Sequence, residues 1–357
     1  MKMTMRWFGP GFDPVTLDKI RQVPGINGII TTLYGKLPGD DWEAGELRAL
    51  IKSAEDSGLS VEGIESVNVH DDIKTGGKER DKYIEKYINT LEVIGKEGIH
   101  LVCYNFMAVF DWTRTDLAKK RPDGATVMSY EQSVIDSINP ANMFDIMNSK
   151  AQGHQLPGWE PHRMAKIKEL FEIYKNIDED TLFKNLVYFL KAIMPVCEQY
   201  GINMAIHPDD PGWSVFGLPR IMKNKDDILR LMKAEDNPHN GVTLCSGSLG
   251  TNQKNDIPDI IRSLKGRIHF AHIRNVKHNC PGSFEESAHL SGDGSLDMYE
   301  IIKALHDIGF EGPIRPDHGR NIWNEESMPG YGLFDRAIGL SYLCGLWEAV
   351  NRASAKK

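Results

Sequence analysis

Four residues that can bind a divalent metal ion stand at matching points of the sequence, each near the end of a short apolar run. His207 lies in INMAIHP and Cys245 in GVTLCSG, whereas His272 lies in RIHFAHIR and Asp317 in GPIRPDH. Imidazole, thiolate and carboxylate groups are common ligands of zinc, iron and manganese. A single His or Cys beside a strand is more often a buried or hydrogen-bonded residue, but four at equivalent positions favour one metal site.

Two alternatives to this ligand set stay open at the level of the sequence. His269 lies on the opposite face of its strand from His272 and could take its place. A closed tetrahedral zinc on the four ligands would be purely structural. A metal that can expand its coordination could instead bind substrate oxygens.

Two residues that can exchange protons follow the fourth ligand. His318 comes directly after Asp317 in RPDHGR, and Tyr331 lies in the glycine-flanked segment PGYG. A metal that holds the carboxylate and hydroxyl of an α-hydroxy acid would acidify the hydrogen on the carbon between them. A His or Tyr could then remove this proton while another acid assists the departing hydroxyl group. Alternatively, His318 orients Asp317 and Tyr331 only packs its loop.

A sugar acid with many hydroxyl groups also needs polar and basic partners. The candidates lie in YNFMAVFDWTRT, in IRNVKHN and in the last strand: Asn105, Trp112, Arg114, Arg274, Asn275 and Arg315. Arginine suits a carboxylate because its planar guanidinium donates two hydrogen bonds at once. For Arg114, a solvated position on the surface is the alternative.

The elements that must position these residues alternate between strands and helices. Apolar runs bounded by turn residues predict eight buried strands, at 5–9, 26–33, 59–66, 99–106, 202–208, 241–247, 267–274 and 312–318. Amphipathic helices are predicted at 42–57, 80–96, 181–200, 226–233, 256–264, 296–308 and 333–350.

Strands separated by helices pair in parallel, and eight of them indicate a closed (β/α)8 TIM barrel. Catalytic residues of such barrels lie at the carboxyl ends of the strands, where the four ligands would meet. An open doubly wound sheet is the alternative, but the nucleotide-binding patterns GxGxxG and GxxxxGK[ST], typical of such sheets, are missing from the expected places.

The whole chain, 1–357, is expected to form one barrel domain with a long insertion after the fourth strand. Residues 107 to about 165 show little regular period, and loops of this length are usually functional or disordered. We expect this segment to be irregular and to cover the carboxyl-terminal face of the barrel as a lid.

Composition restricts the classes of partner and location. A net charge of −8 argues against a nucleic-acid partner, which would favour a basic surface. The sequence has no apolar run of the length needed to cross a membrane and no apolar signal-peptide core at its start. The five cysteines include no CxxC pair, which is typical of a reducing compartment, so a cytoplasmic location is expected.

Several long motifs together resemble one enzyme family, the mannonate dehydratases of the UxuA type. The likeness runs over essentially the whole chain and rests on RWFG, CYNFMAVFDWTRT, MAIHPDDP, TLCSGSLG, HFAHIRNV, RPDHGR and PGYG. It implies dehydration of D-mannonate to 2-dehydro-3-deoxy-D-gluconate, a step of hexuronate breakdown, with one Mn²⁺ or Fe²⁺ per site. It also implies a xylose-isomerase-like barrel and a homodimer or higher homo-oligomer. The residues that it assigns agree with those above: His207, Cys245, His272 and Asp317 as metal ligands, and His318 and Tyr331 as the acid and base in an unspecified order.

Two rival functions stay open beside the dehydratase. An aldose-ketose isomerase on the same barrel would usually hold two metals with several carboxylates, whereas these strand ends offer one carboxylate, two imidazoles and a thiolate. A non-catalytic metal-binding protein would have no need of His318 and Tyr331 near the metal.

Overall fold

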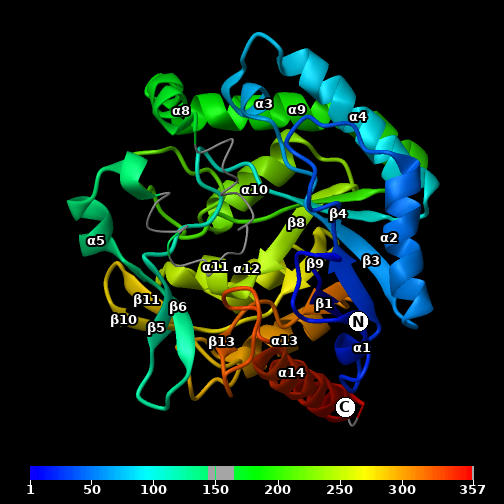
Figure 1. Cartoon of the computed structure of the whole chain (residues 1–357), viewed down its shortest axis with the longest axis vertical. Coiled ribbons are helices and arrows are strands. Elements are labelled where there is room, and N and C mark those ends of the chain that lie inside the picture. The colour runs from blue at the N-terminus through cyan, green and yellow to red at the C-terminus, as the bar shows by residue number, and fades with distance from the viewer. Residues whose placement is uncertain (144–148, 150–164, 356–357) are drawn as a thin grey trace.

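The computed structural model describes residues 1–143, 149 and 165–355, and its centre is a closed barrel of eight parallel strands (Figure 1). Around the barrel the strands follow one another as β1, β2, β3, β4, β7, β8, β9 and β12, and β12 pairs with β1. Their bounds are Lys2–Arg6, Gly28–Thr31, Ser60–Glu65, Leu101–Tyr104, Asn203–Ile206, Asn240–Cys245, Ile268–His272 and Pro313–Arg315. The predicted TIM barrel is therefore confirmed.

The first strand lies earlier in the chain than residues 5–9, where the sequence predicted it. Strand β1 ends at Arg6, and the chain then turns at Gly9, whose φ of 93° lies in the left-handed region that favours glycine. The Asp13 carboxylate accepts a hydrogen bond from the backbone N–H of Phe8. Trp7 and Phe8 are buried although they belong to a loop, which explains why their apolar character resembled a strand.

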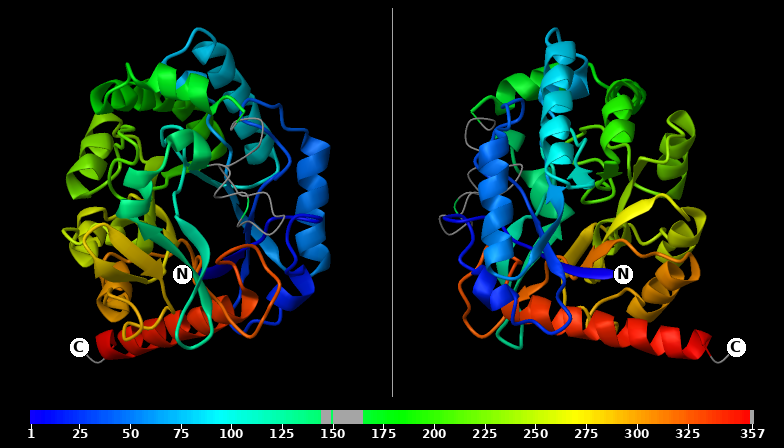
Figure 2. Two further views of the ribbon diagram at one scale, coloured as in Figure 1. Left: turned by 60° about the vertical axis from the view of Figure 1, so that its left-hand side comes forward. Right: turned by 90° about the vertical axis from the view of Figure 1, so that its right-hand side faces the viewer.

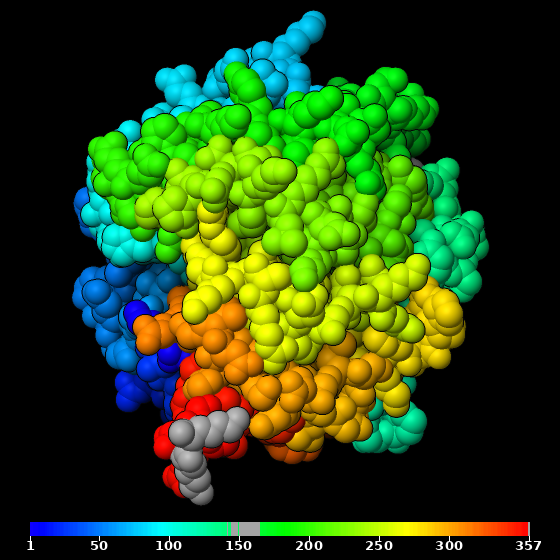
Figure 3. Space-filling model, turned by 180° about the vertical axis from the view of Figure 1, so that it is seen from behind, coloured from blue at the N-terminus to red at the C-terminus, as the bar shows by residue number. Residues whose placement is uncertain are grey.

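Helices surround the barrel, as the two turned views of Figure 2 show. The seven predicted helices are present as α2 (Ala44–Asp56), α4 (Arg80–Lys96), α9 (Glu179–Tyr200), α10 (Lys225–Ala234), α12 (Ile257–Ser263), α13 (Met298–Asp307) and α14 (Leu333–Ser354). Further helices are α1 (Leu17–Ile20), α3 (Asp71–Thr75), α5 (Gln132–Ser137), α8 (Ile167–Tyr174) and α11 (Ser246–Thr251), with a 3₁₀ turn at Pro140–Asn142. From behind, the chain from α9 to α13 forms a closely packed surface (Figure 3).

Helix α9 shows how local sequence fixes these bounds. The Asp178 side chain caps its first turn by accepting a hydrogen bond from the N–H of Thr181 at 2.7 Å. At its other end, Gly201 takes a left-handed φ of 64° that stops the helix. Among the described residues, none of the helices has both the length and the apolar character needed to cross a bilayer.

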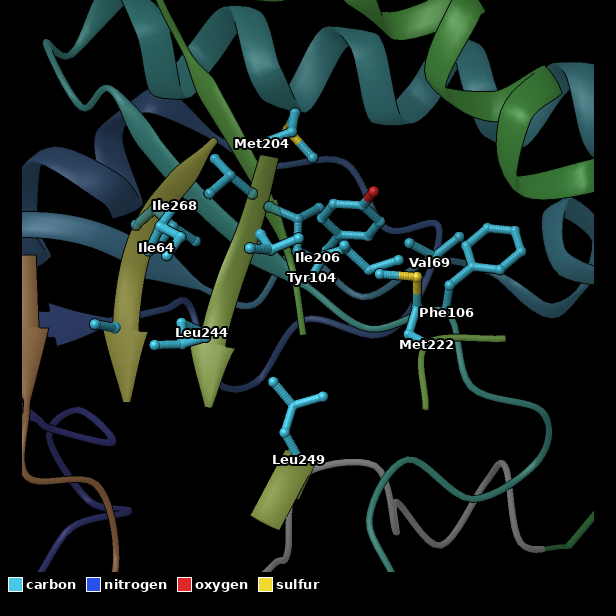
Figure 4. Close-up of a cluster of buried hydrophobic side chains, with 14 of the residues drawn as sticks. Ile64, Val69, Tyr104, Phe106, Met204, Ile206, Met222, Leu244, Leu249 and Ile268 are labelled. Atoms are coloured by element: carbon cyan, nitrogen blue, oxygen red, sulfur yellow. The ribbon is translucent and has the colours of Figure 1, made fainter. Parts of the chain in front are cut away.

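Apolar side chains fill two layers, one between strands and helices and one inside the barrel. Met204 and Ile206 of β7 belong to the outer layer. Strands β3, β4, β8 and β9 add Ile64, Tyr104, Leu244 and Ile268 to it (Figure 4). The separate inner cluster consists of Ile30, Leu101, Cys103, Ala205 and Phe270. Because side chains alternate along a strand, β2, β4, β7 and β9 contribute to both layers. Full burial of one large apolar side chain stabilises the fold by about 1.5–3 kcal/mol, so the strand ends are held on a rigid base.

A second, antiparallel sheet lies beside the barrel and corrects one expectation. The described part of the segment 107–165 is not irregular throughout, because it contains β5 (Asp116–Lys120) and β6 (Thr126–Glu131) as a hairpin. Strand β6 also pairs with β11 (Ser283–Glu286) and β13 (Arg320–Asn321), and β11 pairs with β10 (Val276–Cys280). Residues 144–148 and 150–164 lie outside the described residues, and the expected lid stays a prediction.

Candidate metal and acid-base site

The four predicted ligands meet at the carboxyl ends of the last four barrel strands. His207 follows β7, Cys245 and His272 are the last residues of β8 and β9, and Asp317 lies two residues beyond β12. One ligand atom each of His207, Cys245 and His272 lie within 4.8 Å of one another. Asp317 Oδ2 is 3.9 Å from both Cys245 Sγ and His272 Nδ1. Strand register therefore brings the set together, as the sequence predicted.

The alternative ligand His269 lies elsewhere on β9. It is not part of either metal-competent group found among the described residues. Its ring lies close to Gly241 of the neighbouring strand, where any Cβ would collide with it. Burial lowers the pKa of His269 to about 4, so its imidazole stays neutral.

Electrostatics at the cluster favour a thiolate at Cys245. Burial alone would raise its pKa, but the Arg274 guanidinium and the nearby His207 hold the pKa well below its ordinary value. Ser248 donates hydrogen bonds to the sulfur from its N–H at 3.4 Å and from its hydroxyl at 3.0 Å. Burial would lower the pKa of His207, but interaction with Cys245 raises it to about 9. The Cys245 sulfur therefore favours a positive charge beside it, and a bound metal cation would supply that charge.

Unpaired polar atoms in the cluster also fit a metal. His272 is fully buried, and neither Nδ1 nor Nε2 has a hydrogen-bond partner among the described residues. A buried polar atom without a partner costs about 1–3 kcal/mol, which a bound ligand would offset. Two imidazoles, a thiolate and a carboxylate match the donors preferred by divalent iron, zinc and manganese. The residues present therefore fit a divalent metal.

A cavity of about 1010 Å³, open mouth included, lies over the cluster. Seven of the predicted site residues line it: Asn105, Trp112, His207, Arg315, Asp317, His318 and Tyr331. Met128 of β6 also lines it, so the second sheet borders the mouth of the barrel.

The rings of His318 and Tyr331 contact each other edge-to-face, with centroids 5.5 Å apart, and both side chains line this cavity. The imidazole of His318 lies between two carboxylates, because Nδ1 is 3.4 Å from Glu286 Oε1 and Nε2 is 3.5 Å from Asp317 Oδ2. Tyr331 packs edge-on against Phe8. Burial raises the pKa of the Tyr331 phenol above its ordinary value, which keeps its proton in place.

Glycine allows the loop before Tyr331 to approach His318. Gly330 has a φ of 76°, and a Cβ there would lie 2.6 Å from the Met128 methyl group and 3.2 Å from His318 Cβ. The side chain of Asn321 accepts a hydrogen bond from the Gly330 N–H at 3.1 Å. A larger residue would therefore push the loop away from the cavity.

Three of the predicted substrate-binding residues are fully buried and do not line the cavity. Arg114 donates to Asp210 and Glu286 at 2.7–3.2 Å. Arg274 donates to the same two carboxylates at 2.8 Å each, and its Nε donates to Asp317 at 3.0 Å. We call Arg114, Arg274, Asp210 and Glu286 the arginine network. The alternative of a solvated Arg114 is wrong, because its side chain is 0% exposed.

Asn275, the third of these residues, connects two loops. Its amide nitrogen donates to the carbonyls of Leu290 and Leu296, and its amide oxygen accepts from the N–H of Leu296. It is fully buried. Asn275 therefore holds loops beside the site in place and does not line the cavity.

Sequence reasoning missed other charged residues at the site. Arg6 and Glu65 are the last residues of β1 and β3 and line the cavity. The rule that located the four ligands, applied to the third strand, would have found Glu65. It would have missed Arg6, because the sequence placed the first strand at 5–9 and the strand ends at Arg6. Asp210 lies three residues after His207 in the motif MAIHPDDP, for which the sequence predicted a role at His207 alone. No sequence pattern pointed to Glu286, because it lies on β11 of the second sheet, which the sequence did not predict.

The likeness to known proteins covers the whole chain. A family model described as D-mannonate dehydratase (UxuA) matches residues 1–357. A mannonate dehydratase of Brachyspira hyodysenteriae is 64% identical over 352 residues, with 99% of each chain covered. One of Thermotoga neapolitana is 53% identical over 354 residues, covering 99% of this chain and 98% of the relative.

Solved structures give the same result for the fold. The crystal structure of a mannonate dehydratase from Streptococcus suis serotype 2 has a TM-score of 0.90 at 42% identity, with 99% of this chain and 96% of that chain covered. A 3-keto-D-glucoside 4-epimerase from E. coli has a TM-score of 0.57 at 13% identity, covering 97% of this chain and 99% of that chain. The second likeness shows the fold alone.

Proposed function

Because the chain belongs to the D-mannonate dehydratase (UxuA) family, we propose that it removes water from D-mannonate to give 2-dehydro-3-deoxy-D-gluconate. One observation supports this most strongly. His318 and Tyr331, two side chains that can exchange protons, face the cavity that lies over the cluster of metal-competent residues. A hydro-lyase needs both a base and an acid at one substrate, and this arrangement provides them.

His207, Cys245, His272 and Asp317 would hold one divalent metal, for which we propose Mn²⁺ or Fe²⁺. When bound, it would supply Lewis acidity to the substrate's carboxylate and C2 hydroxyl, which makes the hydrogen at C2 more acidic. The thiolate favours a softer ion than Mg²⁺.

We assign the base to His318 and the acid to Tyr331. The proton at C2 moves to the His318 imidazole, and the electron pair of the C–H bond forms a double bond between C2 and C3. The C3 hydroxyl leaves as water with a proton from Tyr331, and the resulting enol becomes the keto acid. Glu286 and Asp317 stabilise the imidazolium that forms, since both carboxylates lie within 3.5 Å of the ring nitrogens. Burial raises the pKa of Tyr331, so the phenol keeps its proton until the departing hydroxyl takes it.

Arg315 is suited to hold the carboxylate or hydroxyl groups of the substrate. Its Nη2 donates to Glu65 and Asp317, but Nε and Nη1 have no hydrogen-bond partner among the described residues. Arg315 lines the cavity, so its guanidinium lies beside the groups that we assign to the reaction. Asn105 and Trp112 line the same cavity and complete the substrate-binding set that we propose.

A cytoplasmic location and a homodimer or higher homo-oligomer are also part of the proposal. A reducing compartment suits the site because oxidation of the Cys245 thiolate would remove a ligand. The five cysteines are all free in the structure. The oligomer rests on the family resemblance alone.

The test is to incubate the manganese-loaded protein with D-mannonate under reducing conditions and to assay for the keto-deoxy acid. We expect its formation with release of one water per substrate. An isomerase would give a product of unchanged mass, and a binding protein would give none. Either result from an enzyme with a full complement of metal would contradict the proposal.

A further inference from the structure

Glu65, at the end of β3, connects three other strands at the mouth of the barrel. Its Oε1 accepts a hydrogen bond from Arg315 Nη2 at 3.1 Å. Its Oε2 lies 3.4 Å from His272 Nε2 and 3.6 Å from Arg6 Nη1. The carboxylate therefore reaches β12, β9 and β1 at once.

Glu65 Oε2 and His272 Nε2 are both buried, and neither has a hydrogen-bond partner among the described residues. They lie 3.4 Å apart, slightly longer than a normal hydrogen bond. The other ring nitrogen, Nδ1, lies on the side of Asp317, 3.9 Å from Oδ2. A neutral imidazole has one N–H and one lone pair, so a carboxylate beside Nε2 favours the proton there and leaves the lone pair on Nδ1.

We propose that Glu65 is a positioning residue for the metal: it holds His272 in the tautomer whose Nδ1 lone pair faces the ligand cluster. Because the metal belongs to the proposed function, this inference rests on it. Carboxylates beside ligating imidazoles fix ring orientation and strengthen the ligand, and their loss typically weakens metal binding 10–100-fold. Sequence reasoning did not include Glu65 in the site.

Glu65 also acts on a second ligand through Arg315. The same Nη2 atom that donates to Glu65 donates to Asp317 Oδ1 at 2.7 Å. This hydrogen bond leaves Asp317 Oδ2 on the side of Cys245 and His272. Glu65 thus orients the His272 imidazole directly and the Asp317 carboxylate through the Arg315 guanidinium.

The rival interpretation is a second metal site. Ligand atoms of Glu65, Cys103 and His272 also lie within 4.8 Å of one another. Two observations oppose it. The guanidiniums of Arg6 and Arg315 lie beside Glu65 and would repel a cation. Burial raises the pKa of Cys103 well above its ordinary value, so it stays a thiol, and Thr243 already donates to its sulfur at 3.2 Å.

The test compares Mn²⁺ binding by the wild type, Glu65→Gln and the control Glu62→Gln, without substrate. Free Mn²⁺ measured by electron paramagnetic resonance gives the Kd and the number of ions per chain. Glutamine replaces one of the two carboxylate oxygens with an NH2 group, which only donates, so either Arg315 or His272 loses its acceptor and we expect a Kd about 10–100-fold higher. Glu62 lies on the same strand but pairs with Lys2 away from the cavity, so its variant should match the wild type. All three should bind one ion per chain.

A second variant covers the case in which Glu65→Gln does not fold. Glu65→Asp keeps the charge beside both arginines but shortens the reach toward His272, so its Kd should also rise. An unchanged Kd in a folded Glu65 variant would overturn the inference, as would two ions per wild-type chain and one in the variant. A weakened Kd in a chain whose wild type makes no keto-deoxy acid would contradict the proposed function and support the role of Glu65.

Discussion

Two buried polar clusters meet at Asp317 and differ in how fully their atoms are paired. In the arginine network, no side-chain nitrogen or oxygen belongs to the unpartnered buried atoms of the described chain. In the ligand cluster and its surroundings, such atoms include both nitrogens of His272, Nδ1 of His318 and Oε2 of Glu65. Native proteins rarely leave buried polar atoms unpaired. The comparison indicates that the paired cluster is a scaffold and that the unpaired cluster has bonding capacity left for ligands.

Arg274 connects the two clusters. It donates to Glu286 and Asp210 in the network and to Asp317 in the ligand cluster. Buried ion pairs add little net stability over apolar packing, but breaking one costs about 3–5 kcal/mol because a charge is left unpaired. The network thus fixes the position of Asp317 more than it stabilises the fold.

The largest effect is expected from the two residues that we assign to proton transfer. His318→Gln and Tyr331→Phe should each lower kcat about 10²–10⁴-fold, since each removes one proton-transfer group. Steady-state kinetics with D-mannonate measures this loss, and melting temperatures show whether the variants fold. Tyr299→Phe, at an exposed tyrosine of α13, is the matched control. Full kcat in either folded variant would remove that residue from the mechanism.

Within the arginine network, Arg114→Met should act on stability. It leaves Asp210 and Glu286 with one fewer partner in a fully buried place, so the free energy of unfolding should fall by about 3–5 kcal/mol. Urea denaturation of the metal-free protein measures it. Arg48→Met, at an arginine whose side chain is 66% exposed, should change the free energy by about 1 kcal/mol at most. If both variants were equally stable, the network would not be a scaffold.

The smallest effect distinguishes two roles for Asn275. Its hydrogen bonds to Leu290 and Leu296 predict that Asn275→Ala lowers the free energy of unfolding by about 1–3 kcal/mol. The KM for D-mannonate should stay unchanged, because Asn275 does not line the cavity. A tenfold higher KM with unchanged stability would instead support the original prediction that Asn275 binds substrate.

Local patterns were enough to predict the barrel and to bring the four proposed ligands to one place. Alternating strands and helices fix which residues end a strand, so His207, Cys245, His272 and Asp317 could be placed together from the sequence. The second sheet could not be predicted in this way. The strand DLAKK has no apolar period, and its neighbour β6 pairs with β11, which lies about 150 residues later in the chain.

The role of individual arginines was equally hidden. Arg114 and Arg315 look alike in sequence, but Arg114 is paired with two carboxylates away from the cavity, whereas Arg315 lines the cavity and has two unpaired nitrogens among the described residues. The difference depends on Glu286, which reaches Arg114 only after the second sheet has formed. Long-range pairing of this kind leaves no periodic signal around either arginine.

The most direct test of the comparison is anomalous X-ray diffraction at the manganese edge from crystals soaked in Mn²⁺. We predict one strong peak per chain, enclosed by His207, Cys245, His272 and Asp317, with Glu65 beside His272 but not bound to the ion. No peak at these residues, or a peak between Glu65 and Cys103, would contradict the account.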